Sequence, residues 1–164
     1  MTKFKTSETQ GQYHVDGTVS AEDIITMAKR ILNRRFAKGR AMTDPQQSKN
    51  FLTLKLSQLE HEVFSILFLN NQHKVIAYEE LFRGTIDGAS VYPREVLKRA
   101  LHHNAAAVIL SHNHPSGEPE PSQSDIQITQ KLQQALKMVD IRILDHIIIG
   151  GEEPVSLAER GLLS

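Results

Sequence analysis

The sequence predicts a mixed α/β domain in which helices pack against one sheet. Apolar and β-branched residues form short runs with the length of strands, at 61–69, 74–82, 105–111 and 141–149. Other stretches repeat their apolar residues at intervals of three and four positions, which is typical of helices that cover a sheet with one face. The sequence contains no internal repeat and no low-complexity segment.

Start and stop signals predict four helices, over residues 21–38, 43–55, 93–103 and 122–139. Ser20 and Asp23 have the spacing of a capping box at the start of the first helix, and Gly39 ends it. Pro45 and Pro93 suit the first turns of the second and third helices, because proline is pre-organised for that position.

The strands are separated by turn signals. Asn70-Asn71 predicts a turn that joins the strands over 61–69 and 74–82. The short apolar run at 105–111 predicts a central strand, followed by a Pro/Gly-rich loop over 112–121. A last short strand is expected at 155–157, and the polar residues 1–18 are expected to be a loose lead-in.

Composition excludes several classes of protein. The chain has 164 residues, enough for one domain, and its 19 basic and 19 acidic residues give a net charge of zero, which does not favour nucleic acid as an obligatory partner. Without cysteine there is no disulfide, and any metal must be held by His, Asp or Glu. No apolar run reaches 18 residues and no apolar signal core is present, so we expect no membrane span and a cytoplasmic location.

Two histidines stand at the end of the strand predicted over 105–111. His112 and His114 are two positions apart, and in extended backbone such residues point to the same face with their Cα atoms about 6–7 Å apart. Pro115 helps to end the strand, and the restricted loop then delivers Asp125 into the first turn of the next helix. Two imidazoles and one carboxylate leave an open position on a tetrahedral zinc ion, which is typical of a catalytic site.

Each of these residues also has an ordinary structural explanation. A His-x-His pair is common in proteins and is no metal site by itself. Ser122 and Asp125 have the spacing of a helix-capping pair, whose carboxylate the helix dipole favours. From the spacing alone, a metal site and a set of unrelated structural residues both remain open.

The longer pattern resembles a known signature. The JAMM (JAB/MPN) metallopeptidase motif is matched at every spacing by His112-x-His114, seven residues, and then Ser122-x-x-Asp125. Three stretches resemble the bacterial RadC family in particular: HNHPSG at 112–117, GTIDGASVYPRE at 84–95 and LDHIIIG at 144–150. The resemblance implies an MPN/JAB-like fold, with a cytidine-deaminase-like sheet flanked by helices, over 43–164. Residues 1–42 are then an N-terminal polar lead-in and helix.

The resemblance also implies an activity: a zinc-dependent hydrolase that cleaves an amide or isopeptide bond of a peptide or protein substrate with a metal-activated water. It assigns the metal ligands to His112, His114 and Asp125. Glu62, ahead of an apolar strand, matches the general base, with Glu60, Glu79 and Glu80 as rivals. Ser122 matches the residue that stabilises the oxyanion. The alternative is a non-catalytic zinc-binding interaction module associated with DNA repair or processing.

Three departures and side features qualify this picture. Asn113 stands where JAMM deubiquitinases carry Ser or Thr, which weakens any transfer of ubiquitin-like specificity. The resemblance to full-length RadC proteins also implies a helix-hairpin-helix module joined to this domain. The residues before 43 are too few for such a module, so we expect it to be missing. The basic residues over 29–40 are expected to form a solvated helix face rather than a nucleic-acid patch.

Two dipeptides that contain histidine lie outside the motif and need an explanation. Asp145-His146 lies in an otherwise apolar strand, where a satisfied core histidine is favoured over one that orients a zinc ligand. His102-His103 lies near a helix end and is expected to interact with the helix dipole or cap carbonyls.

Overall fold

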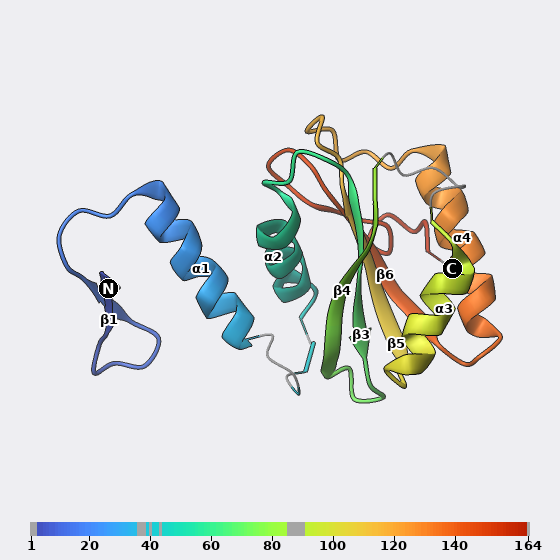
Figure 1. Ribbon diagram of the computed structural model, residues 1–164, viewed down its shortest axis with the longest axis horizontal. Helices are drawn as coiled ribbons and strands as arrows, with labels where there is room; N and C mark the ends of the chain where they lie inside the picture. The colour runs from blue at the N-terminus through green and yellow to red at the C-terminus, as the bar shows by residue number, and fades with distance from the viewer. Residues whose placement is uncertain (1–2, 36–38, 40, 43, 85–90, 164) are drawn as a thin grey trace. The chain divides into compact units, whose positions relative to one another are not determined.

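The computed structural model describes residues 3–35, 39, 41, 42, 44–84 and 91–163. The chain divides into two compact units, Met1–Arg35 and Phe36–Ser164, which are described separately here (Figure 1). Several sequence predictions fall outside the described residues: the end of the first helix at 36–38, the helix start at Thr43, and positions 85–90 of the RadC-like stretch.

The first unit begins with a hairpin of β1 (Phe4–Thr6) and β2 (Tyr13–Val15), which pair antiparallel. The prediction of a loose lead-in is therefore wrong for these residues. Gly11 supplies a positive φ of 83° in the connecting turn, a conformation that glycine adopts without steric cost. The strands are short and largely exposed, so they lack the apolar alternation that signals a strand in sequence.

Helix α1 (Ala21–Arg35) follows the hairpin. Its capping box is confirmed, because the backbone N–H of Asp23 donates to Ser20 Oγ at 3.0 Å and the N–H of Ser20 donates to Asp23 Oδ2 at 2.9 Å. Each side chain satisfies one of the donors that a helix N-terminus leaves without an intrahelical partner.

The second unit holds the sheet and its covering helices. In chain order its described elements are α2 (Pro45–Leu56), β3 (Val63–Leu69), β4 (Val75–Arg83), α3 (Pro93–His102), β5 (Ala107–Asn113), α4 (Gln123–Lys137), β6 (Arg142–Ile149) and β7 (Val155–Ser156). The strand order is β4-β3-β5-β6-β7, with β5 parallel to β6 and every other pair antiparallel. The predicted mixed α/β fold class is confirmed.

The sheet is covered on both faces. Helices α3 and α4 lie on one face and α2 lies on the other (Figure 1). The α3/α4 layer shares one hydrophobic core with alternate residues of the central strands, namely Phe64, Ile66, Phe68, Val108 and Leu110. Because side chains alternate across a strand, His112 continues the row of Val108 and Leu110 toward α4.

Strand β5 is longer than its sequence predicts. His112 and Asn113 were expected in a loop, but both are strand residues. His112 pairs with Phe64 of β3 and with Ile148 of β6, and Asn113 pairs with Ile149. The ladder continues past Ser111 because both neighbouring strands reach that far.

Among the described residues, no helix is both long and apolar enough to cross a membrane.

Candidate metal centre

The two motif histidines occupy the end of the central strand. His112 is fully buried, and His114 stays in register because its N–H donates to the carbonyl of Ile149 at 2.8 Å. Their rings lie on the same side, with centroids 4.8 Å apart. The predicted convergence of residues i and i+2 of an extended strand is thus present.

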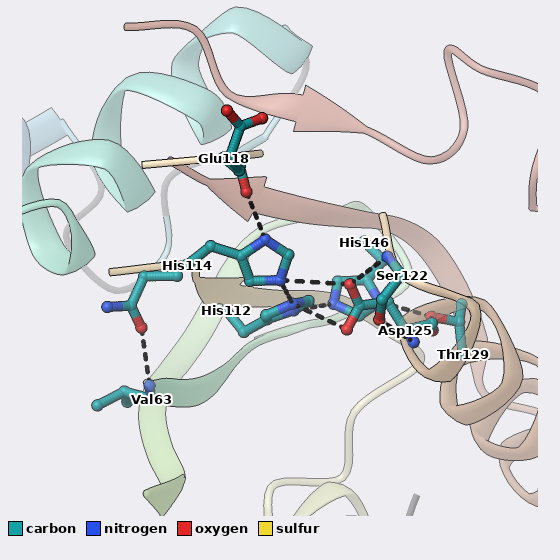
Figure 2. Close-up of polar contacts among 9 residues, drawn as sticks. Val63, His112, His114, Glu118, Ser122, Asp125, Thr129 and His146 are labelled. Atoms are coloured by element: carbon teal, nitrogen blue, oxygen red, sulfur yellow. Dashed lines mark hydrogen bonds and ion pairs between the residues drawn. The ribbon is translucent and has the colours of Figure 1, made fainter. Parts of the chain in front are cut away.

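The loop after the strand orients His114. The carbonyl oxygen of Glu118 lies 2.7 Å from His114 Nδ1. A carbonyl only accepts, so Nδ1 carries the hydrogen, and in neutral His114 Nε2 keeps its lone pair. Nε2 of His114 faces His112 (Figure 2). The loop geometry that places Glu118 therefore selects the nitrogen of His114 that can bind a metal.

Two glycines after β6 let this loop approach closely. Gly151 has a φ of +60°, and a Cβ atom there would lie 2.8 Å from the carbonyl oxygen of Gly117. A Cβ on Gly150 would lie 3.2 Å from the backbone nitrogen of Pro119. Gly151 thus requires the absence of a side chain for the loop to lie where it supports His114, whereas a side chain at Gly150 would make a tight contact with the loop.

A Gly151→Ala substitution is expected to lower the affinity for zinc by about 10–100-fold, as removal of a metal ligand's outer partner does. The new methyl group would push away Gly117 and with it the Glu118 carbonyl that orients His114. Zinc titration measures the change. Gly161→Ala is the matched control, because Gly161 has a similar φ of +69° and nothing within 4 Å. Equal zinc affinities of the two variants would contradict the proposed support.

The start of helix α4 orients the carboxylate. Ser122 is the N-cap, and its backbone N–H donates to Asp125 Oδ2 at 2.8 Å while the N–H of Asp125 donates to Ser122 Oγ at 3.0 Å. The capping explanation is therefore confirmed. It does not compete with metal binding, because the second carboxylate oxygen, Oδ1, faces His112.

The three side chains converge on one point (Figure 2). The two Nε2 atoms of His112 and His114 are 2.9 Å apart. Asp125 Oδ1 lies 3.1 Å from the first and Asp125 Oδ2 lies 3.3 Å from the second. A tetrahedral zinc with bonds of 2.0–2.1 Å holds its ligand atoms about 3.3 Å from one another. One ligand atom from each residue lies within 4.8 Å of the other two, so the three residues are compatible with a zinc ion that keeps its fourth position open.

Charges in the cluster favour a cation. Burial raises the pKa of the Asp125 carboxyl, but its bonds to His112 and His114 outweigh burial and hold this pKa well below its usual range. The same carboxylate raises the pKa of His114, against the opposing effect of burial. A buried carboxylate that stays ionised between two imidazoles supplies the negative charge that a divalent ion requires.

Glu62 lies directly before β3 and is half-buried. Phe64 pairs with His112, so Glu62, two positions earlier, belongs to the same end of the sheet as the cluster. The pKa of His114 is raised mainly by its hydrogen bond to Asp125, and the negative charge of Glu62 adds to this effect. Its rivals are situated differently. Glu79 forms an ion pair with Arg99 at 2.6 Å, and Glu60 and Glu80 are exposed.

Asn113 holds the chain on both sides of Glu62. The Asn113 side chain is 2 % exposed and points to the sheet face opposite the two histidines' face, as alternation requires. Its Oδ1 accepts from the N–H of Val63 at 2.7 Å, and its Nδ2 donates to the carbonyl of His61 at 3.0 Å. The sequence analysis treated Asn113 only as a departure from other families and missed this contact with the start of β3. The signal that could have found it is its position between His112 and His114.

For His146, the sequence analysis favoured a satisfied core histidine over a residue that orients a zinc ligand. It is a buried, satisfied histidine, as favoured, but its partner is a candidate ligand: His146 Nε2 lies 2.7 Å from His112 Nδ1. Burial, followed by repulsion from His112, holds the pKa of His146 well below its usual range. Asp145 instead bonds Ser156 Oγ at 2.6 Å.

The expectation for His103 at the end of α3 was an interaction with the helix dipole, which stays a prediction, or capping of helix carbonyls, which its described side-chain hydrogen bond does not provide. Its side chain reaches Glu79 Oε1, 3.0 Å away on β4, rather than the helix carbonyls, because an ionised carboxylate is the stronger partner.

The fold and the cluster together define a mixed α/β domain with a candidate metal centre at the end of its central strand. A family model described as "RadC-like JAB domain" matches residues 42–162. The chain belongs to this family. The JAB/MPN-like families include zinc metallopeptidases, and the group of His112, His114 and Asp125 is compatible with such a site.

Curated relatives agree with this assignment. A UPF0758 protein of Nitrosococcus oceani is 61% identical over 139 residues, which are 85% of this chain and 62% of the relative. A UPF0758 protein of Thioalkalivibrio sulfidiphilus is 58% identical over 85% of this chain and 62% of its own length. A UPF0758 protein of Vibrio cholerae serotype O1 is 55% identical over 85% of this chain and 88% of its own length. The chain thus spans about 62% of the length of the first two relatives.

Proposed function

We propose that this protein is a zinc-dependent hydrolase of the JAMM type, which cleaves an amide or isopeptide bond in a peptide or protein substrate. The observation that supports this most is the convergence of His112, His114 and Asp125, each of which offers one ligand atom within 4.8 Å of the other two. A site with three protein ligands keeps one position open for chemistry, whereas structural zinc sites fill all four with protein ligands.

Each residue of the site has its own role in the proposed reaction. A zinc ion held by the three ligands would polarise the scissile carbonyl and lower the pKa of a water molecule to about 7. Glu62 takes a proton from this water as its oxygen attacks the carbonyl carbon. As the carbon–nitrogen bond breaks, Glu62 returns the proton to the leaving amine. Asn113 holds the backbone on either side of Glu62 and so keeps the base near the ligands.

Ser122 stabilises the oxygen that becomes negative during the attack. Its oxygen accepts a hydrogen bond from the N–H of Asp125, which occupies a lone pair and leaves the hydroxyl hydrogen to donate. The Ser122 side chain is exposed beside the buried Asp125, so a substrate carbonyl can approach it. Helix capping and oxyanion stabilisation are therefore compatible in one hydroxyl group.

The proposal predicts zinc-dependent cleavage by the full chain. Purified protein loaded with zinc is incubated with a panel of quenched peptides and of peptide pairs joined by a lysine isopeptide bond. We expect cleavage that a chelator stops and that added zinc restores, because the open position is needed for the attack. Cleavage that survives chelation would contradict the proposal. Tight zinc binding with no cleavage of any panel member would favour the zinc-binding interaction module instead.

A further inference from the structure

A chain of buried hydrogen bonds runs behind His112, on the side away from the candidate metal position (Figure 2). His112 Nδ1 lies 2.7 Å from His146 Nε2, and His146 Nδ1 lies 2.6 Å from Thr129 Oγ1. Thr129 Oγ1 in turn lies 2.7 Å from the main-chain carbonyl oxygen of Asp125. The side chains of His112, His146 and Thr129 are all fully buried, so water does not replace any of these partners.

The donor and the acceptor of every hydrogen bond in this series follow from the last group in it, the Asp125 carbonyl. The Asp125 carbonyl can only accept, so the single hydroxyl hydrogen of Thr129 is donated to it. Thr129 Oγ1 then has only lone pairs left for His146, and His146 Nδ1 must carry the hydrogen. A neutral imidazole has one N–H, so His146 Nε2 is an acceptor. His112 Nδ1 must therefore donate, and in neutral His112 this leaves the lone pair of Nε2 facing the metal position.

We propose that Thr129 and His146 are positioning residues, which fix the tautomer of His112 in which Nε2 is free to bind the metal. This inference rests on the proposed zinc site. The two ligand histidines differ in how they are oriented. His114 donates to a carbonyl, which permits one direction only, whereas His112 faces an imidazole, which can either donate or accept. A further group must therefore choose the direction, and Thr129 is that group.

Asp125 consequently acts on the site twice. Its carboxylate lies among the ligand atoms, and its main-chain carbonyl is the terminal acceptor that directs Thr129. Both groups belong to the first turns of α4, where Thr129 is four positions after Asp125. The helix thus couples the third ligand to the protonation pattern of the first.

The tautomers are read directly by nitrogen-15 NMR of labelled imidazoles in the metal-free full chain, at a pH above the raised pKa of His114. We expect both His112 and His146 to carry hydrogen on Nδ1. A hydrogen on Nε2 of His146 would overturn the proposal, and this measurement needs no variant.

A matched pair of variants tests the effect on metal binding. Thr129→Val keeps the shape but removes the hydroxyl, and we expect a 10–100-fold loss of zinc affinity, the usual effect of losing a ligand's outer partner. Thr129→Ser should restore affinity to within a few-fold of the wild type. Thr53→Val is the control, because Thr53 Oγ1 makes the same bond to the carbonyl four positions back, Lys49 O, at 2.7 Å on α2.

The outcomes separate the two proposals. If the wild type binds zinc and Thr129→Val binds it equally well, the positioning role is wrong and the zinc site stands. If Thr129→Val and Thr53→Val lose affinity alike, the effect is a general one of helix hydroxyls, and the positioning role is again wrong. If the wild type binds no zinc, the proposed function fails, while the NMR measurement still decides the direction of the hydrogen bonds.

Discussion

Replacement of His114 by alanine is expected to lower the affinity for zinc by more than about 100-fold, because loss of a ligand exceeds the 10–100-fold effect of losing an outer partner. Only His112 and Asp125 would remain to hold the ion. His114 is the better ligand to remove, since its side chain is 15% exposed, whereas that of His112 is fully buried. An alanine at His112 would leave a cavity in the core beside Phe64. Loss of metal by that variant could then result from unfolding as well as from the missing ligand.

Elemental analysis and zinc titration of the full chain measure this effect. The wild type should contain about one zinc per chain, and the variant should contain little. Titration is made at a pH above the raised pKa of His114, so that protons do not compete with the metal. His14→Ala is the control, because His14 is an exposed histidine of the first unit. An unchanged metal content in His114→Ala would remove the basis of the site.

Glu62→Gln is expected to slow hydrolysis by about 100–10,000-fold, the range that a positioned general base contributes, while zinc affinity stays near that of the wild type. Glutamine keeps the size of glutamate and its polar character at the half-buried position before β3. It cannot accept the proton of the attacking water. A loss of turnover with retained metal would separate the base from the ligands.

The measurement compares cleavage rates of zinc-loaded protein on any substrate that the panel identifies. Glu60→Gln is the matched control, since Glu60 is exposed and lies two positions before Glu62. It should leave the rate within a few-fold of the wild type. If Glu60→Gln abolished cleavage and Glu62→Gln did not, the role of base would pass to Glu60.

Local rules predicted the convergence of His112, His114 and Asp125, whose role as metal ligands stays a prediction. His112 and His114 converge because alternation along a strand is a property of two neighbouring residues, and Asp125 is oriented by a capping box that spans four positions. The roles of Glu62 and Ser122 stay predictions, because a role in catalysis is a matter of reactivity as well as position. Residues 4–15 were missed because exposed, polar strands carry no apolar pattern.

The partners of the site could not be predicted in the same way. That His146 lies behind His112 depends on the register of β6 against β5, in which His146 pairs with Leu110. Asn113 meets Val63 only because β3 pairs with β5 from the other side. Registers between strands that are far apart in sequence are set by the packing of the whole sheet, and a single sequence read locally does not contain them.

The distribution of the site along the chain has a consequence for the order in which it assembles. His112 and Asp125 are 13 positions apart, so closing the segment that holds the ligands costs little entropy. His146 is 34 positions from His112, and Val63 is 50 positions from Asn113. If the cluster binds zinc as proposed, we expect the residues of β5 and α4 to hold the ion early in folding, and Glu62 and His146 to join the site only when β3 and β6 pair with β5. Under the proposed function, this order of assembly would keep an incompletely folded chain inactive.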